Sequence, residues 1–126
     1  MSGKNKSGHI ERILPAIKNS IAGLFLAYKN EIAFRQEVFL FLILSPIAWL
    51  ISASFVELFL LVFSLVFVLV TELLNSAIEA VVDRVGLEHH ELSGRAKDIA
   101  SAAVFVAILF FLMVWGYKVY QYFVLS

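Results

Sequence analysis

The sequence has 126 residues, with ten Lys and Arg against ten Asp and Glu, so its zero net charge gives no indication of nucleic-acid binding. Hydrophobic residues make up 61% of the chain, above the roughly 45–50% that is usual in soluble domains, and cysteine is absent. The composition predicts one small all-α membrane domain over residues 1–126. It excludes disulfides, thiolate metal sites and cysteine nucleophiles.

The first predicted element is an amphipathic helix over about residues 10–30. Its apolar residues recur at helical spacing: Ile10, Ile13, Leu14, Ile17, Ile21, Leu24, Phe25 and Tyr28. Charged residues, among them Arg12 and Lys18, lie on or near the opposite side, so the helix is too polar to cross a bilayer. We expect it to lie in the membrane interface, with a helix of a soluble bundle as the alternative.

Three transmembrane helices are predicted to follow, over about residues 35–55, 57–83 and 98–121. Residues 38–56 and 99–117 are uncharged runs of nineteen residues, close to the length that spans the hydrocarbon layer. Ser52, Ala53 and Ser54 mark a short turn between the first two spans. Residues 84–97 are predicted to form the loop between the second span and the third.

The distribution of cations predicts the orientation of the chain. Cations precede the first span and recur in the 84–97 loop, whereas the turn after the first span has none, so the N-terminus and this loop should be cytoplasmic. Lys118, at the far end, is an exception. Trp115, Tyr117 and Tyr120 are suited to an aromatic belt at the interface. We expect a multi-pass membrane protein.

One stripe of the second predicted span is polar. At helical spacing, one face carries Glu72, Asn75, Ser76, Glu79 and Asp83, and the intervening positions are apolar. Because ionisable residues within a span are costly, such a stripe is a functional-site hypothesis. The alternative is a polar seam that only holds helices together.

The chemistry of the stripe points to a hard metal ion. Three crowded carboxylates need cations, which could be nearby Arg and Lys residues or a metal, and oxygen ligands without Cys favour Mg²⁺. A divalent ion beside Glu79 would suit phosphoryl transfer, and Glu72, deeper in the span, could act as a general base. The polar segment at 30–37 adds Glu31 and Arg35, spaced for an i,i+4 ion pair that could be an ordinary surface pair or part of a site.

The segment VGLEHHELSGRAKD, residues 85–98, has the residue types that bind polyphosphate and a purine. It combines a glycine-containing turn with His89, His90, Arg95 and Lys97, although the Walker pattern is absent. Two solvated loop histidines are the alternative interpretation.

Three segments of the sequence closely resemble the prokaryotic diacylglycerol kinase family, which consists of small integral-membrane lipid kinases. They are NEIAFRQE at 30–37, ELLNSAIEAVVDR at 72–84 and HELSGRAKDIASAAV at 90–104. The resemblance implies phosphorylation of diacylglycerol to phosphatidic acid by MgATP, with Mg²⁺ as cofactor. It also implies a homotrimer of three-span subunits with active sites formed between subunits.

The resemblance also implies roles for individual residues. Glu72 matches the base that deprotonates the lipid hydroxyl, and Asn75 and Asp83 match residues that support catalysis and structure. Metal ligands are matched by Glu31 and Glu79; nucleotide contacts by Arg12, Glu88, His89, His90, Lys97 and Asp98; and positions near the lipid by Arg35, Glu37, Ser101 and Trp115.

Two alternative functions stay open at this point. The acceptor could be undecaprenol or another lipid alcohol. The related branch of the family that prefers undecaprenol, however, usually lacks the HELSGRAKD motif found at residues 90–98. A proton-coupled transporter or channel could use Glu72, Glu79 and Asp83 as a relay.

The sequence departs from the family in the predicted surface helix. Pro15 and Asn19 occupy positions that are often basic and aromatic in the family.

Overall fold

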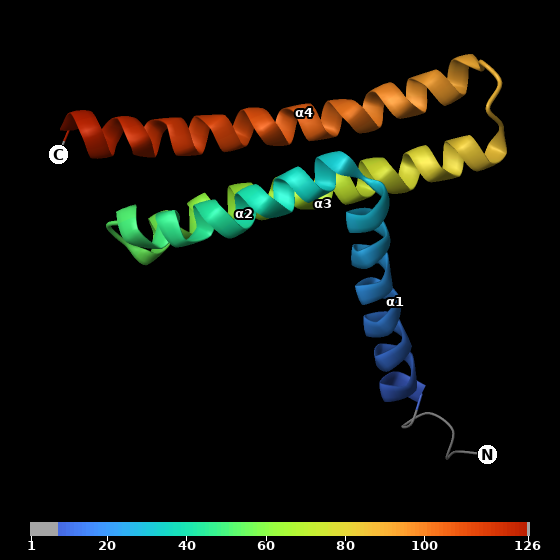
Figure 1. Cartoon of the computed structure of the whole chain (residues 1–126), viewed down its shortest axis with the longest axis horizontal. Coiled ribbons are helices and arrows are strands. Elements are labelled where there is room, and N and C mark those ends of the chain that lie inside the picture. Colours follow the sequence, from blue (N-terminus) through green and yellow to red (C-terminus); the bar gives the residue numbers. More distant parts are fainter. Residues whose placement is uncertain (1–7, 126) are drawn as a thin grey trace.

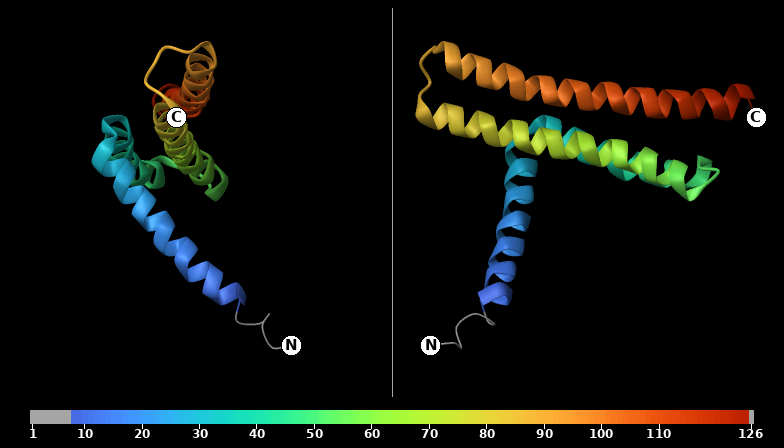
Figure 2. Two further views of the ribbon diagram at one scale, coloured as in Figure 1. Left: turned by 90° about the vertical axis from the view of Figure 1, so that its right-hand side faces the viewer. Right: turned by 180° about the vertical axis from the view of Figure 1, so that it is seen from behind.

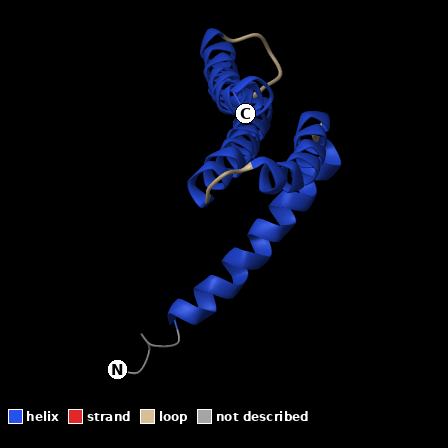
Figure 3. Cartoon of the chain, turned by 90° about the vertical axis from the view of Figure 1, so that its left-hand side faces the viewer, coloured by secondary structure: helices blue, strands red, loops and turns tan. Residues whose placement is uncertain are grey.

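The computed structural model describes residues 8–125, which are almost entirely helical (Figure 1; Figure 3). The elements are α1 (Gly8–Asn30), α2 (Ile32–Ile51), α3 (Phe55–Val85), α4 (Glu91–Tyr120) and a π-helical end, η1 (Gln121–Leu125). The predicted all-α fold with three spans is confirmed, because α2, α3 and the continuous helix from Glu91 to Leu125 are long and apolar enough to cross a membrane. Two of the cations that precede the first span, Lys4 and Lys6, lie outside the described residues.

The three long helices lie side by side, and α1 projects away from them (Figure 1; Figure 2). α3 packs most extensively against α4 and next against α2, whereas α1 contacts mainly α2. None of the residues of α1 is buried, and its apolar side chains, such as Ile13 and Phe25, are exposed. An apolar, unburied helix beside a membrane bundle is consistent with a place in the interface.

The turn between α2 and α3 forms where the serines predicted it. The Ser52 hydroxyl donates to the carbonyl of Ala48 at the end of α2. Ser54 is the N-cap of α3, and its hydroxyl accepts a hydrogen bond from the backbone N–H of Glu57 at 3.2 Å. This Ser-x-x-Glu arrangement resembles a capping box, and it begins α3 at Phe55, two residues earlier than expected.

The loop before the last span is shorter than predicted. Only residues 86–90 connect α3 to α4, and residues 91–97 of the expected loop are the first two turns of α4. His90 caps this helix, since its Nδ1 accepts from the N–H of Leu92 at 3.1 Å, and Glu91 in the first turn favours the helix dipole. The predicted start was too late because it was placed near the beginning of the uncharged run at residue 99. The helix instead begins at Glu91 and includes polar residues that precede this run.

The core lies between α2, α3 and α4, toward the turn at 52–54. Its central residues are Ala48, Leu61, Leu65 and Trp115. The predicted place of Trp115 in an interfacial belt is wrong, because its indole is buried and donates to the carbonyl of Leu61 at 3.2 Å. Tyr117 and Tyr120 are exposed, as a belt requires. Most other large apolar side chains face outward, where lipid is the expected solvent.

Candidate active site

The polar stripe of α3 changes gradually from buried to exposed toward the α3–α4 turn. Glu72 is only 6% exposed, Asn75, Ser76 and Glu79 are half-buried, and Asp83 is exposed. At 1.5 Å per residue, Glu79 lies about 10 Å nearer the turn than Glu72. One helix therefore places a carboxylate at depth and others close to the water-accessible end.

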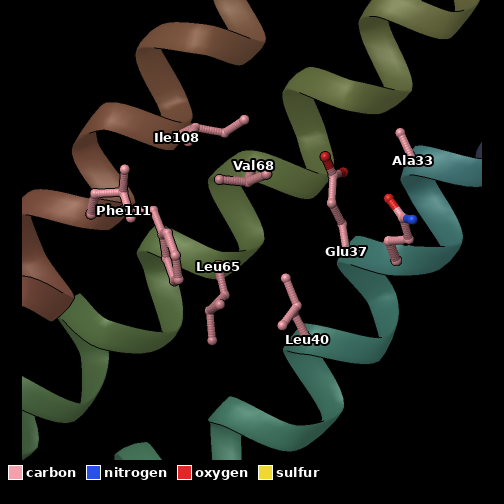
Figure 4. A pocket seen from close by; sticks show the side chains of 9 residues that line it. Ala33, Glu37, Leu40, Leu65, Val68, Ile108 and Phe111 are labelled. Carbon is pink, nitrogen blue, oxygen red and sulfur yellow. The ribbon is translucent and has the colours of Figure 1, made fainter.

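Two further carboxylates approach Glu72 from outside α3. Glu31 lies at the junction of α1 and α2, Glu37 lies in α2, and like-charge repulsion couples Glu72 to Glu31, to Glu79 and to Glu37. Figure 4 shows the carboxylate of Glu37 reaching from α2 toward α3. Its Oε2 is buried and has no hydrogen-bond partner among the described residues. Four carboxylates thus converge from three parts of the chain.

The predicted ion pair between Glu31 and Arg35 is not formed. Glu31 is the N-cap of α2, with an extended backbone and no side-chain capping bond. Arg35 instead turns back toward the end of α1, where its Nη1 donates to the carbonyl of Lys29 at 3.2 Å. The i,i+4 rule fails here because Glu31 precedes the first helical residue. The carboxylate of Glu31 is consequently left for the site.

The oxygen atoms around Glu79 form a donor set that suits a hard cation. The Nδ2 of Asn75 donates to Oε1 of Glu79 at 3.3 Å. Within residues 8–125, the Oδ1 of Asn75 and the hydroxyl of Ser76 are buried without a partner. Carboxylate and amide oxygens with spare capacity are the ligands that Mg²⁺ uses, and Mg²⁺ commonly takes only one or two carboxylates from the protein.

These residues do not form a closed metal site. In the part of the chain that the structure describes, no group of three or more His, Cys, Asp and Glu is arranged to hold a metal ion. A metal ion at this place would need ligands beyond these carboxylates, such as the phosphates of a substrate that Mg²⁺ commonly uses.

A second polar region lies at the α3–α4 turn. A cavity of about 310 Å³ is lined by Asp83, Glu88, His89, His90 and Lys97, together with Gly86, Ser93 and Gly94. Lys97 Nζ lies 2.7 Å from Oδ1 of Asp83, which ties the first turns of α4 to the end of α3. Asp98 lines a neighbouring surface hollow with His89 and Arg95. The predicted nucleotide residues near this turn are thus brought together.

Two largely apolar hollows border the carboxylates. One, of about 260 Å³, lies between α2, α3 and α4 and is lined by Gln36, Glu37 and apolar residues such as Leu65 and Phe111 (Figure 4). The other, of about 770 Å³, lies between α1 and α3, with Asn30, Glu31 and Ser76 among its small and apolar lining residues. Such hollows are suited to acyl chains near a polar reaction centre.

Three predicted site residues are not gathered with the others. Arg12 is exposed on the projecting α1, and Ser101 is exposed on α4. Trp115 lies about 27 Å along α4 from Lys97, and its indole is buried in the core. In this structure Trp115 contacts α3 through Leu61.

Sequence reasoning missed one pair of charged residues. Lys118 Nζ lies 2.7 Å from Oε2 of Glu57, at the end of the bundle opposite the α3–α4 turn. The Ser-x-x-Glu spacing at 54–57 was a signal for a helix start, but nothing in the sequence joins Glu57 to a residue sixty-one positions later.

Comparisons with known proteins identify the family of this chain. The sequence model of the prokaryotic diacylglycerol kinase family matches residues 18–119. The chain belongs to the prokaryotic diacylglycerol kinase family. It is 47% identical to diacylglycerol kinase of Haemophilus influenzae over 111 residues, which cover 88% of this chain and 94% of the relative.

Two further relatives match over similar lengths. Diacylglycerol kinase of Pseudomonas aeruginosa is 47% identical over 113 residues, covering 90% of this chain and 91% of the relative. That of Escherichia coli K12 is 44% identical over 119 residues, covering 94% of this chain and 98% of the relative. The protein is therefore an enzyme of a family of diacylglycerol kinases, and its apolar helices make it a membrane protein.

Proposed function

We propose that this protein transfers the γ-phosphoryl group of ATP to diacylglycerol and so produces phosphatidic acid at the cytoplasmic membrane interface. The observation that carries the proposal is the gradient along α3, from the buried Glu72 to the polar cavity at the α3–α4 turn. A kinase for a lipid alcohol must bring a hydroxyl within the bilayer to a phosphate donor from water. One helix with this gradient can serve both.

The lipid acceptor binds at the deep end of the stripe. The apolar hollows bordered by Glu37 and by Glu31 offer room for acyl chains, with the hydroxyl directed toward Glu72. Arg35 and Glu37 lie at the polar level of α2 and contact the head of the acceptor. Ser101 and Trp115 are proposed as further lipid positions from the family resemblance, although neither lines these hollows within one chain.

The nucleotide binds at the α3–α4 turn. Lys97 is the cation proposed for the phosphates, because it lines this cavity and its charge interacts with Glu79, a proposed metal ligand. His89, His90 and Glu88 line the same cavity, and Asp98 lies in the hollow beside it. Arg12 is exposed on the projecting α1 and does not line this cavity within one chain, so its proposed nucleotide contact belongs to a site formed with a second copy.

The side chains of Glu31 and Glu79, with the side-chain Oδ1 of Asn75, would hold Mg²⁺, which would supply positive charge beside the phosphates of ATP. Glu31 and Glu79 both repel the carboxylate of Glu72. A cation bound between these carboxylates would relieve this repulsion. Asn75 keeps Glu79 oriented through its side-chain amide.

The transfer is a direct in-line displacement. The lipid hydroxyl oxygen forms a bond to the γ-phosphorus, while the bond from that phosphorus to the β–γ bridging oxygen breaks and ADP leaves. The hydroxyl proton passes to the carboxylate of Glu72. Because Glu72 is buried and its neighbours are anionic, it is the carboxylate of the stripe best suited to accept a proton.

The proposal includes a location and an assembly. We place the protein in the bacterial inner membrane, with the N-terminus and the α3–α4 turn in the cytoplasm, where ATP is available. A homotrimer, as implied by the family, would complete each site with residues of a second copy. The buried oxygens of Glu37, Asn75 and Ser76 that lack partners within the described chain support such completion.

A labelled-ATP assay with competing acceptors tests the proposed function. Purified protein in lipid vesicles receives Mg²⁺, [γ-³²P]ATP and either diacylglycerol, undecaprenol or both. We expect label in phosphatidic acid, and diacylglycerol should suppress labelling of undecaprenol. Preferential labelling of undecaprenol would overturn the acceptor, and binding of ATP and lipid without any transfer would overturn the kinase reaction itself.

A further inference from the structure

The end of the bundle opposite the nucleotide cavity carries a carboxylate that is fixed by its own helix. Glu57 lies in the first turn of α3, and its backbone N–H donates to the hydroxyl of the N-cap Ser54. Its Oε2 accepts from the backbone N–H of Ala53 at 2.8 Å. These bonds within residues 53–57 hold the carboxylate in place independently of its contact with α4.

Lys118 of α4 uses this fixed carboxylate as its partner. Its Nζ lies 2.7 Å from Oε2 of Glu57, and the lysine as a whole is only 8% exposed. A buried ammonium in an apolar bundle is costly unless it is paired. The ion pair therefore strongly favours one position of α4 along α3.

A second polar contact joins the same helices one turn further into the bundle. Trp115, three residues before Lys118, donates from Nε1 to the carbonyl of Leu61, four residues after Glu57. The hydroxyl of Ser64 donates to the same carbonyl at 2.7 Å. The Lys118–Glu57 and Trp115–Leu61 contacts are therefore about one helical turn apart on both α4 and α3.

Elsewhere in the interface, Phe110 of α4 packs edge-on against Phe63 and Phe67 of α3, and the exposed pair of Lys97 and Asp83 joins the far ends of the two helices. The most deeply buried residues of α3 and α4 include the small Ser64, Ala100 and Ala107. Small residues allow a close approach but offer few side-chain knobs, and lipid provides no hydrophobic force between helices. Directional polar contacts are therefore expected to decide the axial register.

We propose that Glu57, Lys118 and Trp115 are positioning residues that set the axial register of α4 against α3 and thereby place Lys97 opposite Asp83. A displacement at Lys118 also moves Lys97, because α4 is one continuous helix from Glu91 to Tyr120. The consequence for nucleotide binding rests on the proposed function, whereas the register itself does not.

Distance measurements between spin labels test the register directly. Because the chain has no cysteine, Val81→Cys on α3 and Ile99→Cys on α4, both exposed, provide the only labelling sites. The labelled chain is diluted with unlabelled chain in lipid, so that each distance is measured within one chain. Glu57→Gln and Lys118→Met should each broaden or shift the distance distribution, with displacements of about 1.5 Å for each residue of sliding.

Matched variants separate the ion pair from a general loss of charge. Lys118→Arg keeps a cation and should keep the narrow distribution, and Trp115→Phe should broaden it through loss of the indole bond. Glu91→Gln is the control, because Glu91 pairs with Arg95 within α4 itself. Should a single variant fail to insert, Glu57→Gln with Lys118→Met leaves no unpaired charge and gives the same readout. An unchanged distribution in both the single and the double variants would overturn the proposal.

Kinetic measurements test whether a change in the axial register of α4 alters nucleotide binding. In Glu57→Gln and Lys118→Met, the KM for MgATP should rise several-fold while kcat changes less, and Lys118→Arg should restore KM. A merely structural loss would lower the amount of active enzyme without changing KM, and that result would overturn the link to Lys97. If the wild-type chain transfers no phosphate, the proposed function fails while the spin-label distances still decide the register.

Discussion

At the level of single residues, depth along α3 distinguishes carboxylates that are chemically alike. Glu72 is buried, whereas Glu79 is half-buried, lies about two turns nearer the water-accessible turn and accepts a hydrogen bond from Asn75. The same functional group can therefore serve as a base at one position and as a metal ligand at the other. We assign these two roles as part of the proposed function.

Replacement of Glu79 by Gln should weaken the use of Mg²⁺. The variant loses one anionic oxygen ligand, so the Mg²⁺ concentration for half-maximal rate should rise at least about tenfold, a magnitude typical of disturbed metal sites. A Mg²⁺ titration of the initial transfer rate measures this effect. Glu91→Gln, an identical change at an exposed position, should leave the titration curve unchanged. An unaltered curve for Glu79→Gln would refute its role as a ligand.

The spacing of residues predicted the stripe but not what surrounds it. Glu72, Glu79 and Asp83 share a face because the helical period fixes their directions. The approach of Glu31 depends on how α1 and α2 meet, so only the resemblance to a family pointed to it. The pairing of Glu57 with Lys118 depends on tertiary packing alone, and no sequence signal connects them.

At the level of elements, the helices follow apolar runs, but their ends follow capping groups. The turn at Ser52 to Ser54 was predictable because serine marks helix ends. The start of α4 was not predicted, because His90 acts as the cap and the helix extends two turns beyond the apolar layer. Those extra turns carry Lys97 to Asp83, so the error concerned the part of α4 that lines the polar cavity at the α3–α4 turn.

A bulky residue at the α3–α4 contact should separate the helices. Ala107 has no exposed surface, so Ala107→Leu must push α3 away or adopt a strained side-chain conformation. We expect a loss of about 1–3 kcal/mol in the free energy of unfolding, the usual cost of overpacking. Unfolding in mixed micelles measures it. Val106→Leu, on the exposed side of α4, is the control, and equal stability of the two variants would contradict the packing described here.

At the level of the whole molecule, three spans and a projecting helix divide the surface into membrane and aqueous parts. The fold class was predictable from composition and from the length of the apolar runs, which a bilayer constrains strongly. The direction in which α1 projects and the hollows that it borders were not, since they depend on contacts between elements. Orientation across the membrane follows from the cations and stays a prediction.

Cysteine labelling measures that orientation. Ala53→Cys in the α2–α3 turn and Leu87→Cys in the α3–α4 turn each introduce a single exposed thiol into a chain without cysteine. In intact spheroplasts, a membrane-impermeant maleimide should label Ala53→Cys, and it should label Leu87→Cys only after permeabilisation. The reverse pattern would contradict the predicted orientation, and with it the proposed binding of ATP at the α3–α4 turn.

The most direct test of the account is phosphoryl transfer by Glu72→Gln in lipid vesicles, measured together with its binding of MgATP. The neutral amide keeps the shape of the side chain but cannot accept the hydroxyl proton. We therefore predict that transfer of label from ATP to diacylglycerol is lost, while MgATP binds with nearly the wild-type affinity. Transfer at the wild-type rate would contradict the account, because the buried carboxylate of α3 would then have no part in the reaction.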